Sequence, residues 1–388
     1  MKTFIHLIKE VQQPGRCLRC GGCVTFCTAI NYGALELDEH GTPRFKDIDK
    51  CIECGLCYVI CPQTHELDDE IKKLAAWQAP IGCVRDVSVA RATAHDIRRR
   101  GTDGGVVTAL LLHLLDKRGI DGAIVTKQTG LLQRSPWLAT TREEIIDAAG
   151  FHFDTSQGLE LYSKLYANYS TYSPSVLEVG HIGRKPLNRV AFVGTPCQVN
   201  TIRKIQAMDI EPARSIKILF GLFCTGNFVF DSEQKQQIEQ IGNFKWHQVD
   251  RINIKEQLIV HLCNNETRFI TLDQLDSMKR HACHYCLDYT SEFADLSFGG
   301  LGAPQGWTTI IARTPLGESL LDDASVMSIE RYPNNGNPDI RSEAYKKAIK
   351  WSDRKKQNAN FFSRNTEVNH RRRKTDRAAY HLVGIDSA

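Results

Sequence analysis

The sequence contains no apolar run long enough to cross a membrane. Its longest apolar stretches, such as Gly105–Leu115, fall well short of the roughly 20 residues that a bilayer requires. The segment Met1–Glu10 lacks the apolar core and the cleavage site of a secretion signal. We therefore expect a cytoplasmic protein without a membrane span.

The sequence also lacks a strong excess of charge of one sign. It has 49 basic and 45 acidic residues, a net charge of +4, which argues against a nucleic-acid partner. The basic residues gather late in the chain, in Arg354–Lys356 and Arg371–Lys374, where a solvated face is the usual interpretation. The 388 residues, 42% hydrophobic and 24% charged, are typical of a folded protein of about two or three domains.

Cysteine, by contrast, is abundant, with 14 residues. In a chain without a secretion signal this points to metal ligation rather than disulfides. Two runs follow the pattern C-x2-C-x2-C-x3-C, the second continued by Pro62, as in two-cluster ferredoxins, where the fourth cysteine of each run binds the other cluster. Structural zinc is the alternative, but it usually shows paired C-x2-C knuckles. The expected ligands of the two 4Fe–4S clusters are Cys17, Cys20, Cys23 and Cys61 for one, and Cys51, Cys54, Cys57 and Cys27 for the other.

These runs define a ferredoxin-type domain over residues 1–81. Between them, apolar segments flank Asp38–Gly41, which predicts a hairpin. Residues Glu66–Ile81 begin charged and contain Pro80, which predicts a short helix followed by a linker.

A glycine-rich turn, Gly101–Gly105, opens an apolar helical pattern that continues to Asp116. A helix N-terminus with free N–H groups suits a phosphate. The turn is neither G-x-G-x-x-G nor a P-loop, so a plain helix start and a phosphate cradle both stay open.

Two more cysteines follow predicted strands. Arg189–Val193 leads to Cys197, and Ile216–Phe223 leads to Cys224. Together with the knuckle Cys283-x2-Cys286 they provide four thiols, for which a third cluster, zinc and a redox dithiol are all open. The remaining two cysteines have no partner spacing and are expected to be ordinary buried thiols, Cys83 and Cys263.

Short segments spread over residues 83–330 match, in order and spacing, a known family. They are Ala90–Thr93, Asp103–Thr108, Ala148–Gly150, Gly194–Gln198, Gly221–Cys224, Cys283–Asp288, Ala294–Ser297 and Gly306–Thr309. In these segments the chain resembles the beta subunit of coenzyme F420-reducing hydrogenase and its dehydrogenase relatives.

The resemblance implies FAD and hydride exchange with the deazaflavin coenzyme F420. It also implies a third 4Fe–4S cluster on Cys197, Cys224, Cys283 and Cys286, and no catalytic side chain. Lys127, at the end of the strand Ala123–Thr126, is a candidate for stabilising anionic flavin, and an ordinary surface lysine is the favoured alternative. The other implied cofactor-binding residues are Arg91, Gly104, Gly105, Val106, Thr108, Ser156 and Thr195.

One segment departs from the family pattern. Where members carry Gly-[Ser/Thr]-x-Tyr, this chain has Phe151 and Phe153 in place of the small residue and the tyrosine. The departure bears on the identity of the hydride partner. Ferredoxin-dependent reduction of another organic substrate, or exchange with NAD(P)H, is the alternative.

The predicted fold class is α+β, with a small ferredoxin-like N-terminal domain and a larger mixed-sheet flavin-binding domain over residues 82–330. Residues 331–388 are expected to form a basic extension with a helix at Ser342–Lys356 that wraps the body or a partner. FAD would convert electron pairs into single electrons. The three clusters would carry these to a partner subunit or ferredoxin, within a hetero-oligomeric complex. A purely relaying subunit is the alternative to a complete enzyme.

Overall fold

The computed structural model describes most of the chain. The described ranges are 1–38, 40–130, 133–150, 155–156, 174–183, 187–228, 232–333 and 339–382. Within them, the side chains of 29–31, 130, 133, 155–156 and 365–382 are not described.

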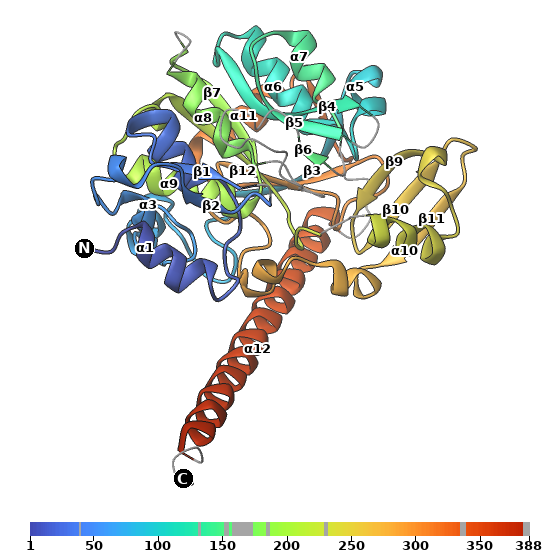
Figure 1. The fold of residues 1–388 in the computed structure, drawn as a ribbon. Helices are drawn as coiled ribbons and strands as arrows, with labels where there is room; N and C mark the ends of the chain where they lie inside the picture. Colours follow the sequence, from blue (N-terminus) through green and yellow to red (C-terminus); the bar gives the residue numbers. More distant parts are fainter. Residues whose placement is uncertain are drawn as a thin grey trace.

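The described strands of the body form a nine-stranded mixed sheet (Figure 1). Its centre is parallel, since β12, β8, β7 and β4 pair in parallel, while β14, β3 and β13 on one side and β5 on the other pair antiparallel. The last strand, β6, pairs in parallel with β5. In spatial order the strands are β14 (Ile329–Arg331), β3 (Asp86–Ala92), β13 (Thr308–Ala312), β12 (Leu296–Gly299), β8 (Ile216–Leu222), β7 (Val190–Gly194), β4 (Gly122–Gly130), β5 (Gln133–Ala139) and β6 (Thr155–Ser156).

Helices cover both faces of this sheet. In β4, Ala123 and Val125 pack toward one face and Ile124 toward the other, as the two-residue period of a strand requires. The first face is covered by α6 (Val106–Asp116), α7 (Arg142–Asp147) and α11 (Pro315–Ala324), and the second by α4 (Asp68–Leu74), α8 (Val179–Ile182) and α9 (Pro196–Ala207). A strand that is buried on both faces is a continuous apolar run in the sequence, and this pattern predicts both β7 and β8.

The N-terminal region is built from short elements around the two cysteine runs. The predicted hairpin is confirmed, with β1 (Leu35–Leu37) antiparallel to β2 (Pro43–Phe45). The described α-helices around the runs are α1 (Phe4–Leu7), α2 (Gly22–Val24) and α3 (Leu56–Val59), and π-helical segments continue the first two over Ile8–Gln12 and Thr25–Asn31.

This region shares buried side chains with the body. Leu177 packs into the N-terminal core, and Phe26 and Ile60 pack with Ile205 of α9. The short helix predicted at the start of Glu66–Ile81 is confirmed as α4, and its Ile71 lies in the core beneath the sheet. The two parts therefore meet through an apolar interface rather than a free tether.

A second, smaller sheet lies at the edge of the body and has no counterpart in the sequence predictions. It is antiparallel, in the order β11 (Thr267–Thr271), β10 (Gln257–Leu262) and β9 (Val249–Ile254), and packs on α10 (Ser232–Gly242). Cys263, predicted to be buried, is exposed beside it. The prediction failed because Cys263 falls just after the end of β10, at the start of a turn on the surface.

The chain's last described helix is α12 (Ile340–Leu382), much longer than the predicted Ser342–Lys356. Its first half lies against the body and its second half projects away from it (Figure 1). None of the described helices combines the length and apolarity that crossing a membrane would need. The predicted fold class, mixed helix and sheet with a small N-terminal region and a large mixed sheet, is confirmed.

Candidate functional site: three groups of cysteines and a shared cavity

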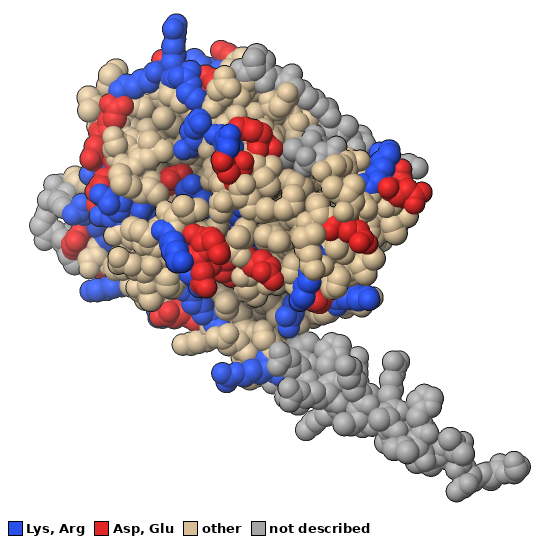
Figure 2. All heavy atoms as spheres, turned by 90° about the vertical axis from the view of Figure 1, so that its left-hand side faces the viewer, with Lys and Arg blue, Asp and Glu red and all other residues tan. Residues whose placement is uncertain are grey.

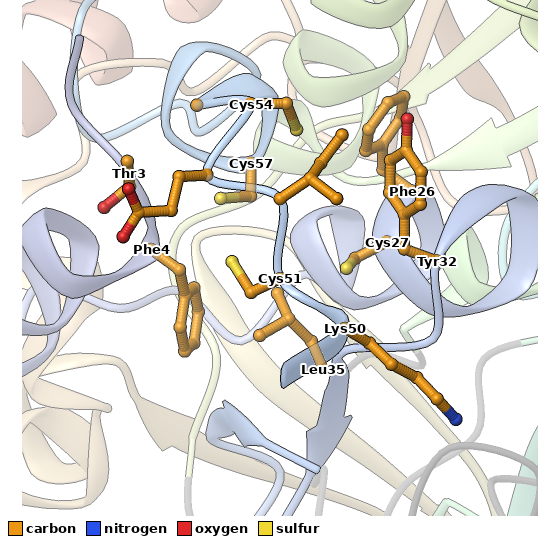
Figure 3. A pocket seen from close by; sticks show the side chains of 13 residues that line it. Thr3, Phe4, Phe26, Cys27, Tyr32, Leu35, Lys50, Cys51, Cys54 and Cys57 are labelled. Carbon is orange, nitrogen blue, oxygen red and sulfur yellow. The ribbon is translucent and has the colours of Figure 1, made fainter. Parts of the chain in front are cut away.

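Four N-terminal cysteines surround one small pocket. Cys27 comes from the first run, and the other three come from the loop that precedes α3 and from its first turn (Figure 3). Apolar side chains, among them Phe4, Phe26 and Leu35, form much of the remaining wall, which Thr3, Lys50 and Glu53 complete. The four are the residues that the crossing rule predicted for one cluster: Cys27, Cys51, Cys54 and Cys57. Four thiols in an apolar enclosure are the donor set of a 4Fe–4S cluster.

The other four N-terminal cysteines also lie together. Burial raises the pKa of Cys61, and the neighbouring thiol of Cys20 raises it further. The pKa of Cys23 is raised by burial and then by Cys20 and Cys17. A nearby positive charge favours the ionised form of such thiols, and iron bound by these four cysteines would supply it.

No three His, Cys, Asp or Glu side chains in the described part of the chain converge tightly enough to hold a single metal ion. A cubane is a larger body than one ion, and it spaces its four thiolates around its corners.

The third group of cysteines lines a larger cavity of about 310 Å³. Cys197 and Cys224 follow the adjacent parallel strands β7 and β8, whose carboxyl ends meet at one edge of the sheet. Cys283 and Cys286 come from the turn His281–Tyr285 and its end. Carboxyl ends of parallel strands are the usual position of a ligand site in open α/β sheets.

Local contacts fix the first of these cysteines. Thr195 caps α9, its backbone N–H donates to Oε1 of Gln198 at 2.9 Å, and Pro196 occupies the first helical position. Cys197 thus sits in the first turn, with its Sγ 3.3 Å from the Thr195 hydroxyl. Burial, and then the nearby Cys20 thiol, raise the pKa of Cys197 well above its usual value.

The other walls of the cavity include the N-terminus of α6. Gly105 caps this helix with φ of 70°, a conformation that favours glycine, and its first turn contributes Val106 and Thr108. A Cβ on Gly105 would lie 2.9 Å from the Ile97 carbonyl oxygen, so the turn has no room for a side chain. The helix start and the third group of cysteines share one cavity.

Several predicted cofactor-binding residues have other partners. Arg91 pairs with Glu330 and stacks 4.4 Å over Trp307, and it is not among the residues that line the cavity. Lys127 lies 4.8 Å over the ring of Trp137. The backbone N–H of Gly104 donates to the Thr308 hydroxyl at 3.0 Å, and this hydrogen bond ties the glycine-rich turn to β13.

Two further predictions concern the segment after Gly150. The backbone of Ser156 forms β6, but its side chain is not described. Phe151 and Phe153 lie outside the described residues.

The structure adds residues to the cavity that the sequence did not single out. Arg134 of β5 is 1% exposed and lines it. Asp103 and Asn253 line it too, with the Asn253 amide donating to Asp103 at 2.7 Å and Lys255 3.4 Å away. Burial raises the pKa of Asp103, although Lys255 and Asn253 act against the shift. Arg134 stands in a strand of mixed character, so the sequence held no signal of its burial.

A lysine from α12 also reaches the cavity. Lys355 lines it, although its run, Arg354–Lys356, was predicted to be a solvated face. That prediction is right for Arg354, which is exposed and pairs with Asp273 at 3.1 Å, and wrong for Lys355, which is 8% exposed. A basic triplet on a helix points in three directions, so one member can face inward.

Comparison with known proteins agrees with this geometry. Family models for the coenzyme F420 hydrogenase/dehydrogenase beta subunit match residues 87–163 (N-terminal part) and 187–332 (C terminus). The beta subunit of coenzyme F420 hydrogenase from Methanococcus voltae is 31% identical over 247 residues, which cover 63% of this chain and 82% of that protein. The chain belongs to the coenzyme F420 hydrogenase/dehydrogenase beta subunit family.

The N-terminal residues match a different model. Residues 9–62 match the 4Fe-4S dicluster domain, so this family member carries an iron–sulfur domain ahead of the beta-subunit region. The coenzyme F420-dependent sulfite reductase of Methanocaldococcus jannaschii is similar over more of the chain, with 28% identity across 81% of this chain and 46% of that protein.

A solved structure shares the fold. A chain of the F420-reducing [NiFe] hydrogenase complex from Methanosarcina barkeri superposes with a TM-score of 0.59 at 28% identity, covering 71% of this chain and 93% of that chain. These similarities make the protein an iron–sulfur member of a family of oxidoreductase subunits.

Proposed function

We propose that this chain exchanges hydride between FAD and coenzyme F420, or a similar carrier, and passes single electrons through three 4Fe–4S clusters to a partner protein. One observation carries the proposal: the third group of cysteines and the N-terminus of α6 line the same cavity. A hydride-accepting cofactor held there would lie beside the cluster that takes its electrons.

The cavity of about 310 Å³ offers polar groups that suit the diphosphate of FAD. The first turn of α6 offers backbone N–H groups, and Arg134 offers a buried guanidinium, both suited to a diphosphate. When bound, FAD supplies the conversion between electron pairs and single electrons.

The clusters would be held by the three groups of thiols described above, and each would carry one electron at a time. We infer the order in which electrons would pass between the three cysteine groups from their proximity, because the Cys197 thiol lies near that of Cys20. The third group would therefore exchange electrons with the Cys20 group, and that group with the pocket around Cys57.

Coenzyme F420 is proposed as the carrier because the named relatives are F420-dependent hydrogenase and sulfite reductase proteins. Several of them are named as subunits, which supports a role within a hetero-oligomeric complex. The ranges of the family models support a division into residues 1–81, 82–330 and 331–388. Figure 2 shows acidic and basic side chains interspersed on one face, so a partner of mixed charge would fit it.

Anaerobic purification with iron, sulfide and flavin quantitation, followed by stopped-flow mixing with reduced F420, tests the proposal. We expect about twelve irons, since each of three clusters holds four, together with one FAD per chain and rapid bleaching of the flavin. Bleaching by ferredoxin or NADH but not by F420 would move the function to another substrate. About eight irons and no flavin would overturn the proposal and leave a two-cluster relay.

A pair of cysteine variants tests whether four of the irons belong to the third group of cysteines. Cys283→Ser should lose about four irons, whereas Cys263→Ser, which changes an exposed thiol away from the cavity, should retain the full content. Equal iron content in the two variants would contradict the proposed third cluster.

A further inference from the structure

The helix α12 meets the body along a stripe of small side chains that a single lysine interrupts. The buried positions recur every three or four residues, so they share one helix face. They are Ala344, Ala348, Ser352, Lys355 and Ala359. Small residues let the helix approach closely, and a long cationic side chain in that stripe has to enter the body.

The Lys355 side chain connects the two loops that carry three of the four cysteines in the third group. Its Nζ donates to the backbone carbonyl oxygens of Cys224 and Asp288, each at 2.7 Å. Cys224 follows β8, and Asp288 comes two residues after Cys286. Lys355 therefore ties the β8 loop to the Cys283–Cys286 loop, and it lines the cavity together with all four thiols.

Aromatic contacts hold α12 in this position from both sides of Lys355. The ring of Trp351 lies 6.0 Å from that of Tyr289, next to Asp288. About two helical turns beyond Lys355, Phe362 stacks at 4.7 Å on His284, which lies between the knuckle cysteines. The ammonium is thus fixed relative to the loops.

The nearby buried acids are shared among several cations. Asp288 and Glu292 lie near the buried guanidinium of Arg313, Asp288 also lies near Lys355, and Glu292 pairs with Lys356 at 2.9 Å. Two carbonyl oxygens give Lys355 hydrogen bonds but no formal negative charge. Burying an ammonium is costly unless a negative charge lies close by, and the thiolates of the third group line the same cavity as Lys355.

We propose that Lys355 is a positioning residue for the third cluster, which fixes the two ligand loops and raises the reduction potential of the cluster through its charge. This inference rests on the third cluster of the proposed function. A cubane with four thiolates carries an overall charge of about −2 when oxidised and −3 after it accepts one electron, and net charge is one of the determinants of its potential. A buried ammonium stabilises the more negative state more strongly.

The test is a potentiometric titration of the complete, anaerobically purified chain, followed by electron paramagnetic resonance. Dithionite supplies and ferricyanide removes the single electron per cluster through mediators, and the signal lost in Cys283→Ser identifies the third cluster. In Lys355→Met we expect the midpoint potential of this signal to shift to a lower value, while the N-terminal signals stay in place. Lys355→Arg, which keeps the charge, should titrate closer to the wild type.

Lys350→Met is the matched control, because Lys350 is an exposed lysine on the same helix. It should leave every potential unchanged. A Lys355→Met chain with full iron content and wild-type potentials would overturn the inference, as would an equal shift in Lys350→Met.

If Lys355→Met loses the third cluster, the loop-fixing half of the inference is supported, and Lys355→Gln then tests the charge. Gln keeps a hydrogen-bond donor without charge, so a retained cluster with a lower potential is the expected result, and an unchanged potential would overturn the electrostatic half. A wild-type chain that lacks the third signal would instead overturn the proposed function.

Discussion

The hydroxyl oxygen of Thr201 lies 3.5 Å from the sulfur of Cys20, across the boundary between the body and the N-terminal region. The same hydroxyl donates to the carbonyl oxygen of Cys197 at 2.9 Å. A fully buried side chain on α9 therefore connects one residue from each of two cysteine groups. It marks the point where the third group and the first N-terminal group approach each other.

Replacing this hydroxyl should change the potential of the N-terminal cluster. A thiolate cannot donate a hydrogen bond, so in the cluster-bound protein Cys20 can only share the single Thr201 O–H proton with the Cys197 carbonyl oxygen. Hydrogen bonds to cluster sulfur stabilise the reduced state. Thr201→Val removes this shared contact, which contributes less than about 1 kcal/mol, and should lower the midpoint potential by less than about 40 mV for one electron.

Thr201→Ser is the control for this measurement, because it keeps the hydroxyl and removes only a methyl group. Its potential should equal that of the wild type in the same titration. A Thr201→Val protein whose N-terminal signals titrate as in the wild type would show that the contact has no electrostatic effect on the cluster.

Arg134 and Arg91 should differ in their effect on flavin binding. Arg134 is buried in the cavity wall, whereas Arg91 is engaged by Glu330 and Trp307 outside it. Arg134→Met should reduce flavin bound per chain at least about tenfold, since a charge-assisted contact with a phosphate contributes roughly 1.5–3 kcal/mol. Arg91→Met should leave flavin content unchanged.

Flavin released by acid and measured by fluorescence gives both values, and circular dichroism checks that each variant folds. Loss of flavin from Arg91→Met with none from Arg134→Met would reverse the assignment and place the flavin beside Arg91.

The contact of α4 with α9 should contribute to stability. Lys204 of α9 is fully buried, and its Nζ lies 2.8 Å from Asp68 and 3.2 Å from the Cys61 carbonyl oxygen. Asp68→Asn leaves that ammonium without its counter-charge and should lower the free energy of unfolding by about 2 kcal/mol, less than for a fully buried pair because Asp68 is partly exposed. Adding Lys204→Met to Asp68→Asn should restore part of the loss.

The pH dependence of this contribution has a definite sign. Partial burial raises the pKa of Asp68, but hydrogen bonds from His65 and Lys204 outweigh it and leave the pKa below its usual value. The stabilisation is therefore complete above the unfolded-state pKa of about 3.9 and is lost as the pH falls through the lower folded-state pKa. Urea unfolding of the four proteins of this double-mutant cycle at pH 7 measures the coupling, and additive effects of the two substitutions would contradict it.

Local spacing predicted much of this site. The crossing rule assigned Cys27 to the ligands of the second run, and these four thiols surround one pocket. Strand patterns placed Cys197 and Cys224 after β7 and β8, where parallel strands bring them to one edge. These inferences worked because each depends on neighbouring residues or on a short repeat.

The residues that the sequence missed act across long separations. Lys355 contacts the backbone of Cys224, 131 residues away in the chain, and nothing in a basic triplet reveals which lysine faces inward. Arg91 belongs to a segment typical of the family, yet its guanidinium takes a partner on β14. Spacing carries no information on such pairings, because they arise only when the strands and helices pack.

The position of Lys355 on the last helix has a consequence for biogenesis. The eight N-terminal cysteines are translated within the first 61 residues, long before residue 355. The loops of Cys224 and Cys283 gain their shared lysine only after residue 355 has been translated and α12 has docked. A chain that ends before α12 would therefore keep all twelve of the proposed ligand cysteines and still lack the side chain that joins two of the ligand loops.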